Sequence, residues 1–307
     1  MTRRILPIQF CLDQSKFLPL RPVETKKHAF SPLIPGDTTT YIYDTEEDYM
    51  NHYADCYYAF TWRKAGWDCM RHLEIIAAGS VPYFKDLAEC PANIMTKFPK
   101  ALVLEAMHLP GVNETGIDFT LFNKHRYNEL RRRIYNHARE HLTCASMATY
   151  VLDQVLLPWS VGVRVLYLSD CDKPDYMRCQ LLIGLKRLLG IDCVDVLKIP
   201  HIYQSYTGDV TQLYGKGMGY TRVIENDPYI ERGRHYINRQ IERGYFDLVI
   251  FGSMHRISHA TCRHVRRYYD PSKIIYVCGE DYHDITQCMT HIKDNSTLFL
   301  REFFLST

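Results

Sequence analysis

The chain has 307 residues, 46% hydrophobic and 23% charged, with a formal net charge of +2. This composition excludes a disordered chain, and such a small charge gives no positive field that requires a nucleic acid partner. At roughly 100–200 residues per domain the length predicts two domains, and no apolar run approaches the roughly 20 residues that span a bilayer.

The first half of the chain alternates between short strands and helices. Residues 1–40 contain five prolines and are expected to be rich in loops. The predicted strands are 57–62, 81–84 and 101–106. The predicted helices are 67–78 and 123–156. Gly79 ends the first helix, and the second has an expected break near Thr143.

The second half has the stronger pattern, because its apolar runs are continuous and typical of strands that are buried on both faces. The predicted strands are 163–169, 192–197, 246–253, 273–281 and 296–303. The predicted helices are 175–190, 227–244 and 258–269. Alternation of strands and helices favours right-handed crossovers and a parallel sheet. We therefore predict an α/β protein with a doubly wound second domain and a smaller α/β first domain, and with a boundary between 158 and 162.

Three loops of the second domain follow predicted strands. Ligands of open parallel sheets bind beyond the carboxyl ends of the strands, so these loops are expected to line one cleft. The first loop carries Asp170, Asp172 and Asp175, the second Ser253, His255 and Arg256, and the third Asp281. Asp175 also stands where a helix N-cap is expected.

Metal binding is an open alternative in these loops. Asp170 and Asp172 have the DxD spacing of metal-dependent sugar transferases, although two acids in a loop are a weak signal. His255 and His259 are four residues apart, but no glutamate completes an HExxH motif, so we expect no zinc site.

Residues 214–220 read YGKGMGY and contain GxGxG. No clear strand precedes them, and the spacing is neither GxGxxG nor a phosphate-binding GK[ST] motif. We predict a flexible loop there and no dinucleotide site.

The 11 cysteines are odd in number, irregularly spaced and without a CxxC pair. This pattern favours free thiols in a reducing compartment. The N-terminal residues also lack the apolar segment and cleavage site of a signal peptide. The expected location is therefore cytoplasmic.

Glu74 has two interpretations. It shares one helical face with Arg71, and the cations Arg63 and Lys64 lie just upstream. A helix N-terminus after a strand suits an anion, so a glutamate there could accept both hydroxyls of a ribose while the cations face a diphosphate. Alternatively, Arg71 and Glu74 form an ion pair on an exposed surface.

Residues 64–91, KAGWDCMRHLEIIAAGSVPYFKDLAECP, resemble the donor-site segment of exostosin-like glycosyltransferases. The shared residues are Glu74, Ala77, Ala78, Gly79 and Pro82. The second half is similar to the partner domain in exostosin-like proteins of large DNA viruses of algae and of some bacteria. The resemblance covers about residues 30–305 and is most specific in 64–91.

The resemblance implies a GT-B transferase, in which two Rossmann-like domains face each other across a cleft. Residues 1–158 would bind the nucleotide sugar and residues 159–307 the acceptor, an order that is swapped relative to most GT-B enzymes. Glu74 would bind the donor ribose, and Arg71, Lys64 and Arg63 would face the diphosphate. Gly79 and Pro82 complete the donor segment.

The implied reaction is inverting transfer of a sugar from a UDP-sugar to a hydroxyl of an oligosaccharide acceptor. Asp172 is the first choice as general base, followed by Asp170, with Asp281 and His255 as alternatives. The acceptor-side candidates are Asp175, Ser253 and Arg256. GT-B chemistry requires no metal or other cofactor.

The resemblance leaves the sugar open. Xylose is the example that it suggests, and a viral source would imply a capsid glycan as acceptor and a location in the host cytoplasm. The rival interpretations are a DxD, Mn²⁺-dependent transferase and a non-catalytic protein that binds glycans or nucleotides.

Overall fold

The computed structural model describes residues 4–156, 158–160, 162–226, 231, 234–281, 292 and 295–302. The chain divides into two compact units. The main unit comprises Met1–Asp13, Asn93–Thr96 and Cys144–Thr307, and the inserted unit comprises Gln14–Ala92 and Lys97–Thr143. The predicted boundary at 158–159 differs from this division, because an N-terminal strand and the helix Cys144–Leu156 belong with the second half of the chain.

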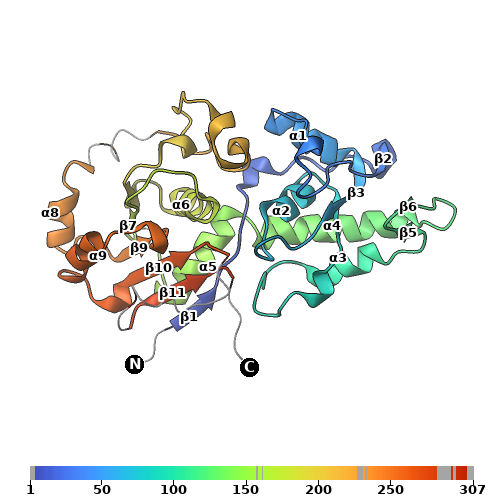
Figure 1. Ribbon diagram of the computed structural model, residues 1–307. Helices are drawn as coiled ribbons and strands as arrows, with labels where there is room; N and C mark the ends of the chain where they lie inside the picture. The colour runs from blue at the N-terminus through green and yellow to red at the C-terminus, as the bar shows by residue number, and fades with distance from the viewer. Residues whose placement is uncertain are drawn as a thin grey trace. The chain divides into compact units, whose positions relative to one another are not determined.

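The main unit contains a parallel sheet whose described strands have the order β1-β11-β10-β9-β7-β8. The strands are β1 (Arg4–Pro7), β7 (Val165–Leu168), β8 (Cys193–Val196), β9 (Leu248–Phe251), β10 (Ile274–Cys278) and β11 (Thr297–Leu300). Figure 1 shows the blue β1 beside the red β11. From β7 the chain moves outward to β8 and then returns to β9 on the other side of β7, so a topological switch point lies between β7 and β9.

Burial explains why these strands form. Every residue of β7, β9, β10 and β11 is buried, as expected for a parallel sheet with both faces covered. The described helices of this unit are α5 (Cys144–Leu156), α6 (Tyr176–Leu189), α8 (Ile237–Glu242) and α9 (His259–Arg266). Gly184 lets α6 approach α5 closely, since a Cβ there would stand 1.9 Å from the carbonyl oxygen of Cys144.

A buried ionic network anchors the edge strand β8. The Asp195 carboxylate is fully buried and lies 2.8 Å from Lys186 Nζ of α6 and 2.5 Å from Arg234 Nη2. The Tyr203 hydroxyl donates a hydrogen bond of 2.7 Å to the same carboxylate oxygen. Burial raises the pKa of Asp195, but the two cations outweigh it and leave the pKa below its usual value.

The inserted unit has a parallel sheet of order β2-β3-β4 and, separately, an antiparallel pair β5-β6. Its strands are β2 (His28–Phe30), β3 (Cys56–Thr61), β4 (Val81–Phe84), β5 (Val112–Asn113) and β6 (Gly116–Ile117). Its helices are α1 (Glu46–Ala54), α2 (Met70–Ala77), α3 (Lys100–Met107) and α4 (Lys124–His141). Gly79, with φ of +76°, ends α2 as predicted. Among the described helices of the chain, none is long and apolar enough to span a membrane.

The α/β class with parallel sheets is confirmed and is compatible with Rossmann-like units. The break near Thr143 is confirmed between α4 and α5. The predicted strand at 101–106 is wrong, because this segment forms α3 and buries Val103, Ala106 and Met107 at helical spacing. The expected loops of residues 1–40 include the short strands β1 and β2. Part of the predicted helix 227–244 lies outside the described residues, and α8 is its described portion.

Candidate functional site

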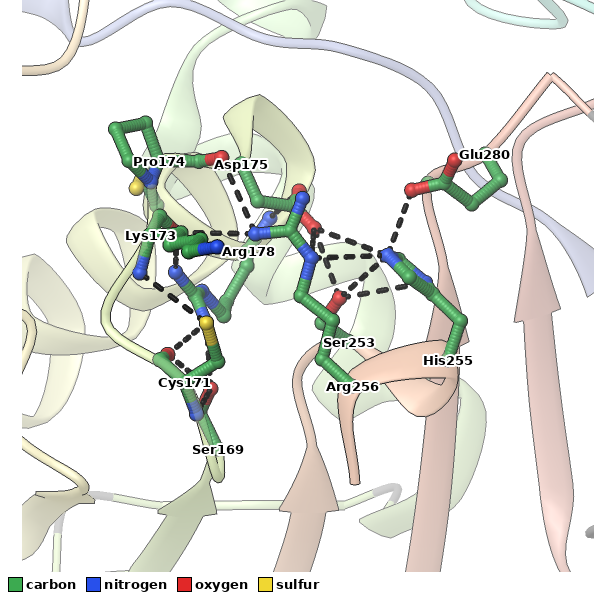
Figure 2. A network of polar contacts seen from close by, with 12 residues as sticks. Ser169, Cys171, Lys173, Pro174, Asp175, Arg178, Ser253, His255, Arg256 and Glu280 are labelled. Carbon is green, nitrogen blue, oxygen red and sulfur yellow. Dashed lines mark hydrogen bonds and ion pairs between the residues drawn. The ribbon is translucent and has the colours of Figure 1, made fainter. Parts of the chain in front are cut away.

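The loops after β7, β9 and β10 meet at the switch point of the main sheet, as the strand-end rule predicts. We call Asp175, Ser253, His255, Arg256 and Glu280 the switch-point cluster (Figure 2). The sequence placed the first four in loops that should converge, and the structure brings them together. Glu280 lies in the third predicted loop, where Asp281 was the chosen candidate.

Asp175 holds the cluster at the start of α6. One of its carboxylate oxygens accepts the backbone N–H of Arg178 at 3.1 Å, which makes Asp175 the predicted N-cap. The other oxygen accepts the hydroxyl of Ser253 at 2.8 Å. Asp175 therefore combines a structural role with a place in the site.

His255 lies in a short 3₁₀ turn, Met254–Arg256, just after β9. Its Nε2 atom is 2.7 Å from Oε1 of Glu280 and 3.9 Å from Oδ2 of Asp175. Burial lowers the pKa of His255, but hydrogen bonds with Cys278 and Glu280 outweigh it and raise the pKa to about 9. The hydrogen bond with His255 in turn lowers the pKa of Glu280. At neutral pH the pair is an imidazolium and a carboxylate.

Arg256 bridges two of the loops. Its Nε atom lies 3.1 Å from Nε2 of His255 and 4.0 Å from Oδ2 of Asp175. Its Nη1 atom donates to the carbonyl oxygens of Lys173 and Pro174 at 3.1 and 3.3 Å. The guanidinium thus adds positive charge beside the Asp175 carboxylate and the His255 ring (Figure 2).

Arg178 holds the loop after β7 in place through hydrogen bonds. It is fully buried in α6 and donates to Ser169 Oγ at 2.5 Å and to the carbonyl oxygens of Cys171 and Lys173. These bonds fix the backbone that leads to Asp175. Sequence reasoning missed this residue, because an arginine in the first turn of a helix looks like a surface residue.

The cluster does not form a serine nucleophile triad. In such a triad the two ring nitrogens of histidine serve different partners. Here Ser253 Oγ lies almost equally far from both ring nitrogens of His255, at 3.4 Å from Nδ1 and 3.3 Å from Nε2, so it is aligned with neither. Nε2 also lies 2.7 Å from Oε1 of Glu280. Moreover, the Ser253 hydroxyl donates to Asp175, so the histidine does not receive its proton.

The three aspartates that were predicted as candidate bases lie outside the cluster and differ in their surroundings. Asp170 is bonded to the start of α9: its Oδ2 accepts the N–H of the N-cap residue Ser258 at 2.6 Å and the Thr261 hydroxyl at 3.0 Å. Asp281 forms an ion pair with Arg301. Asp172 is exposed and makes no hydrogen bond or ion pair within the described part of the chain. Asp172 therefore has the carboxylate that is most open to an incoming group.

Within the described ranges, Asp175, His255 and Glu280 form a group that could share a metal ion. Asp170 and Asp172 do not belong to it, and Asp170 is already bonded to α9. His259 is exposed at the first position of α9, after the Ser258 cap, and also stands outside the group. Of the two histidines at i, i+4 spacing only His255 thus belongs to the group, and neither aspartate of the DxD alternative does.

The glycine-rich segment 214–220 is a loop, in which Tyr214–Gly217 form a short 3₁₀ turn that is interrupted by positive φ at Gly215 and Lys216. Gly215 has φ of +60°, and a Cβ there would stand 1.9 Å from the hydroxyl of Tyr176. The rings of Tyr214 and Tyr220 contact that of Tyr176, the first residue of α6. The segment therefore packs beside the residue that follows Asp175.

In the inserted unit, Glu74 lies in the second turn of α2 and is only 7% exposed. The Tyr49 hydroxyl donates to its carboxylate at 2.8 Å. Burial raises the pKa of Glu74 to about 7, against the opposing effects of this bond and of the charge of Arg71. The alternative that Glu74 and Arg71 form an ion pair on an exposed surface is therefore wrong, because both side chains are buried and Arg71 is also only 7% exposed.

The other donor-side candidates surround α2. Arg71 donates to the hydroxyl of Tyr41 and lies over its ring at 5.2 Å. Arg63 lies 5.4 Å from the ring centroid of Trp67, and its backbone N–H donates to Asp86, whereas Lys64 is exposed.

Gly79 and Pro82 have structural explanations. The Gly79 carbonyl accepts from the buried Lys26 ammonium at 2.9 Å. Pro82 is buried in β4, opposite Ala59 of β3. β4 is an edge strand of the described sheet, where proline is tolerated.

No protein-family model, no curated protein and no solved structure matches this chain.

Proposed function

We propose that this protein is a glycosyltransferase that moves a sugar from a UDP-sugar to a hydroxyl group of a glycan, with inversion. The observation that carries the proposal is the buried Glu74 carboxylate, whose pKa of about 7 keeps it ionisable near neutrality. It lies on the helix that follows a strand of a parallel sheet, within the segment that resembles exostosin-like transferases. The proposed arrangement is GT-B, with the inserted unit as the donor-binding unit.

On the donor side, an ionised Glu74 accepts hydrogen bonds from the two ribose hydroxyls of UDP. A carboxylate has free acceptor sites for both, even while Tyr49 donates to one oxygen. Arg71 lies one turn earlier on α2, and the exposed Lys64 lies in the loop between β3 and α2. These cations supply charge for the diphosphate, whose departure they would stabilise.

On the acceptor side, a base removes the proton of the attacking hydroxyl. The new bond forms between the acceptor oxygen and the anomeric carbon, while the bond from that carbon to the diphosphate oxygen breaks and UDP leaves. Asp172 is the proposed base, because its carboxylate is exposed, whereas Asp170 is bonded to α9 and Asp281 to Arg301. His255 is a poorer base, because its raised pKa keeps it protonated at neutral pH.

Calorimetric titration with UDP and a panel of UDP-sugars that includes UDP-xylose tests the donor site. We expect Glu74→Gln to raise the Kd at least about tenfold, the size of one lost charge-assisted hydrogen bond. Glu129→Gln is the matched control, because Glu129 pairs with Arg126 on the exposed side of α4. Equal affinity in the wild type and Glu74→Gln would remove Glu74 from the donor site.

Release of UDP in the presence of glycan acceptors tests the chemistry. Asp172→Asn should abolish UDP release and leave donor affinity unchanged, since the base acts only after the donor has bound. Normal turnover in this variant would place the base elsewhere. A wild-type protein that binds UDP-sugars but releases no UDP with any acceptor would instead be a non-catalytic binding protein.

A further inference from the structure

We propose that Asp175, His255 and Glu280 bind a divalent metal ion of the Mn²⁺ type at the switch point of the main sheet. This inference goes beyond the proposed glycosyl transfer, which requires no metal. The three side chains come from the loops after β7, β9 and β10, which are far apart in sequence and meet at one edge of the sheet.

The distances fit one shared ion. Nε2 of His255 lies 2.7 Å from Oε1 of Glu280 and 3.9 Å from Oδ2 of Asp175, and all three ligand atoms lie within 4.8 Å of one another. Nitrogen and oxygen ligands bind such ions at about 2.0–2.2 Å, which places neighbouring ligand atoms about 3–3.5 Å apart. Shifts of less than about 1 Å, together with release of the Nε2 proton of His255 to solvent, therefore complete the coordination.

The ligands are supported by the surrounding structure. The side chains of Asp175 and His255 are only 8% and 20% exposed, and that of Glu280 is 35% exposed. Ser253 donates to the carboxylate of Asp175, and the N-cap bond fixes its other oxygen. Hydrogen bonds of this kind orient metal-binding carboxylates. The more exposed Glu280 leaves a side from which an ion can enter.

A positive charge already lies beside two of the three ligands. Nε of Arg256 lies 3.1 Å from His255 Nε2 and 4.0 Å from Asp175 Oδ2. A metal ion and this guanidinium cannot both approach the same ligand atoms, so they must compete. Arg256 is held in place by carbonyl oxygens of the neighbouring loop, which makes it a defined competitor.

The ligand types select the class of ion. Carboxylates favour Mg²⁺, Ca²⁺ and Mn²⁺, while an imidazole favours Zn²⁺, Fe²⁺ and their neighbours. Two carboxylates with one imidazole suit Mn²⁺, which accepts both. Mn²⁺ is also the better probe, because free thiols, which this chain contains, bind Zn²⁺ strongly.

The test is a titration of the full chain with Mn²⁺, without nucleotide, in which electron paramagnetic resonance measures free Mn²⁺. The wild type should bind one ion. His255→Ala and Glu280→Gln should each raise the Kd at least about tenfold. Arg256→Gln should lower the Kd several-fold, because the competing charge is gone. Asp172→Asn is the matched control and should bind as the wild type does.

Three outcomes would overturn the proposal. The first is a wild-type chain that leaves the free Mn²⁺ signal unchanged at millimolar concentration. The second is binding that Asp172→Asn abolishes and His255→Ala does not, which would support the DxD alternative. The third is an unchanged or higher Kd in Arg256→Gln, whose native melting temperature shows that it is folded. Since no nucleotide is present, none of these outcomes depends on the proposed donor site.

Discussion

Glu74 in the inserted unit and Glu280 in the main unit are the same side chain in two opposite electrostatic environments. Burial raises the pKa of Glu74 to about 7, and its hydrogen-bond donor is a neutral tyrosine. The pKa of Glu280 is lowered, because its partner at 2.7 Å is the protonated His255. The two glutamates thus differ both in burial and in the charge of the hydrogen-bond partner.

Asp195 separates the two effects. It is more deeply buried than Glu280, yet its pKa is also lowered, because Lys186 and Arg234 both contact it. A buried carboxylate with two cations is thus stable in its charged form, whereas Glu74 has only partial compensation. Incompletely compensated buried acids occur disproportionately at functional sites, which is why Glu74 carries the proposed donor site.

The largest expected effect on stability comes from neutralising Asp195, the buried carboxylate that contacts two cations. Asp195→Asn should destabilise the protein by about 3–5 kcal/mol, since it leaves two cations beside a neutral group in the interior. Urea denaturation at pH 7 measures the loss. Asp209→Asn, an exposed cap in the same unit, should change stability far less. Equal effects would mean that the Asp195 network contributes no more than a surface cap.

Glu74→Gln should stabilise the protein, whereas Asp195→Asn should destabilise it. The pKa of Glu74 is raised in the folded protein, so the contribution of Glu74 to stability is fully present below about pH 4.5 and is lost as the pH rises to about 7. The neutral glutamine escapes this loss and should stabilise the protein by up to about 3 kcal/mol at pH 8. Urea curves at pH 5 and pH 8 test the prediction. A difference that does not grow with pH contradicts the raised pKa.

Tyr49→Phe removes the main hydrogen bond to Glu74. At pH 8 the acceptor is charged, so we expect a loss of about 2 kcal/mol, and at pH 5, where it is neutral, a loss of about 1 kcal/mol. Tyr135→Phe is the control, because the Tyr135 hydroxyl donates to the neutral carbonyl of Leu18 in the same unit. The control should show the same loss at both pH values in urea denaturation.

Glu280→Gln should have the smallest effect, a loss of under about 1 kcal/mol, because its ion pair with His255 is partly exposed to solvent. The measurement is thermal denaturation in EDTA, so that bound metal does not contribute. Glu242→Gln on α8 serves as an exposed control. A stabilised Glu280→Gln variant would show that the charge of Glu280, like that of Glu74, destabilises the folded protein, and it would contradict the lowered pKa of Glu280.

The strand-end rule explains why much of the site was predictable. Loops after parallel strands meet at one edge whatever their sequence, so Asp175, Ser253 and His255 could be grouped from the strand pattern alone. Which acid in a loop turns inward depends on side-chain geometry. In the third loop Glu280 contacts His255 while Asp281 pairs with Arg301. In the first loop Asp170 bonds to the start of α9 and not to the cluster.

Other features could not be predicted, because they depend on long-range contacts. Residues 101–106 form a short apolar run that suits a buried strand or a buried helix, and their packing decides for α3. The burial of Arg178 follows from carbonyl groups of a loop whose path the sequence does not define. Likewise, β1 pairs with β11, nearly the full chain length away.

That pairing has a consequence for biosynthesis. β1 is made first, but its described partner β11 ends at Leu300, so at about 5–20 residues per second β1 waits about 15–60 s for it. The inserted unit has its whole sequence available once residue 143 has left the ribosome. It can therefore fold while the main sheet still lacks its later strands, and the N-terminal strand joins that sheet as one of the last steps.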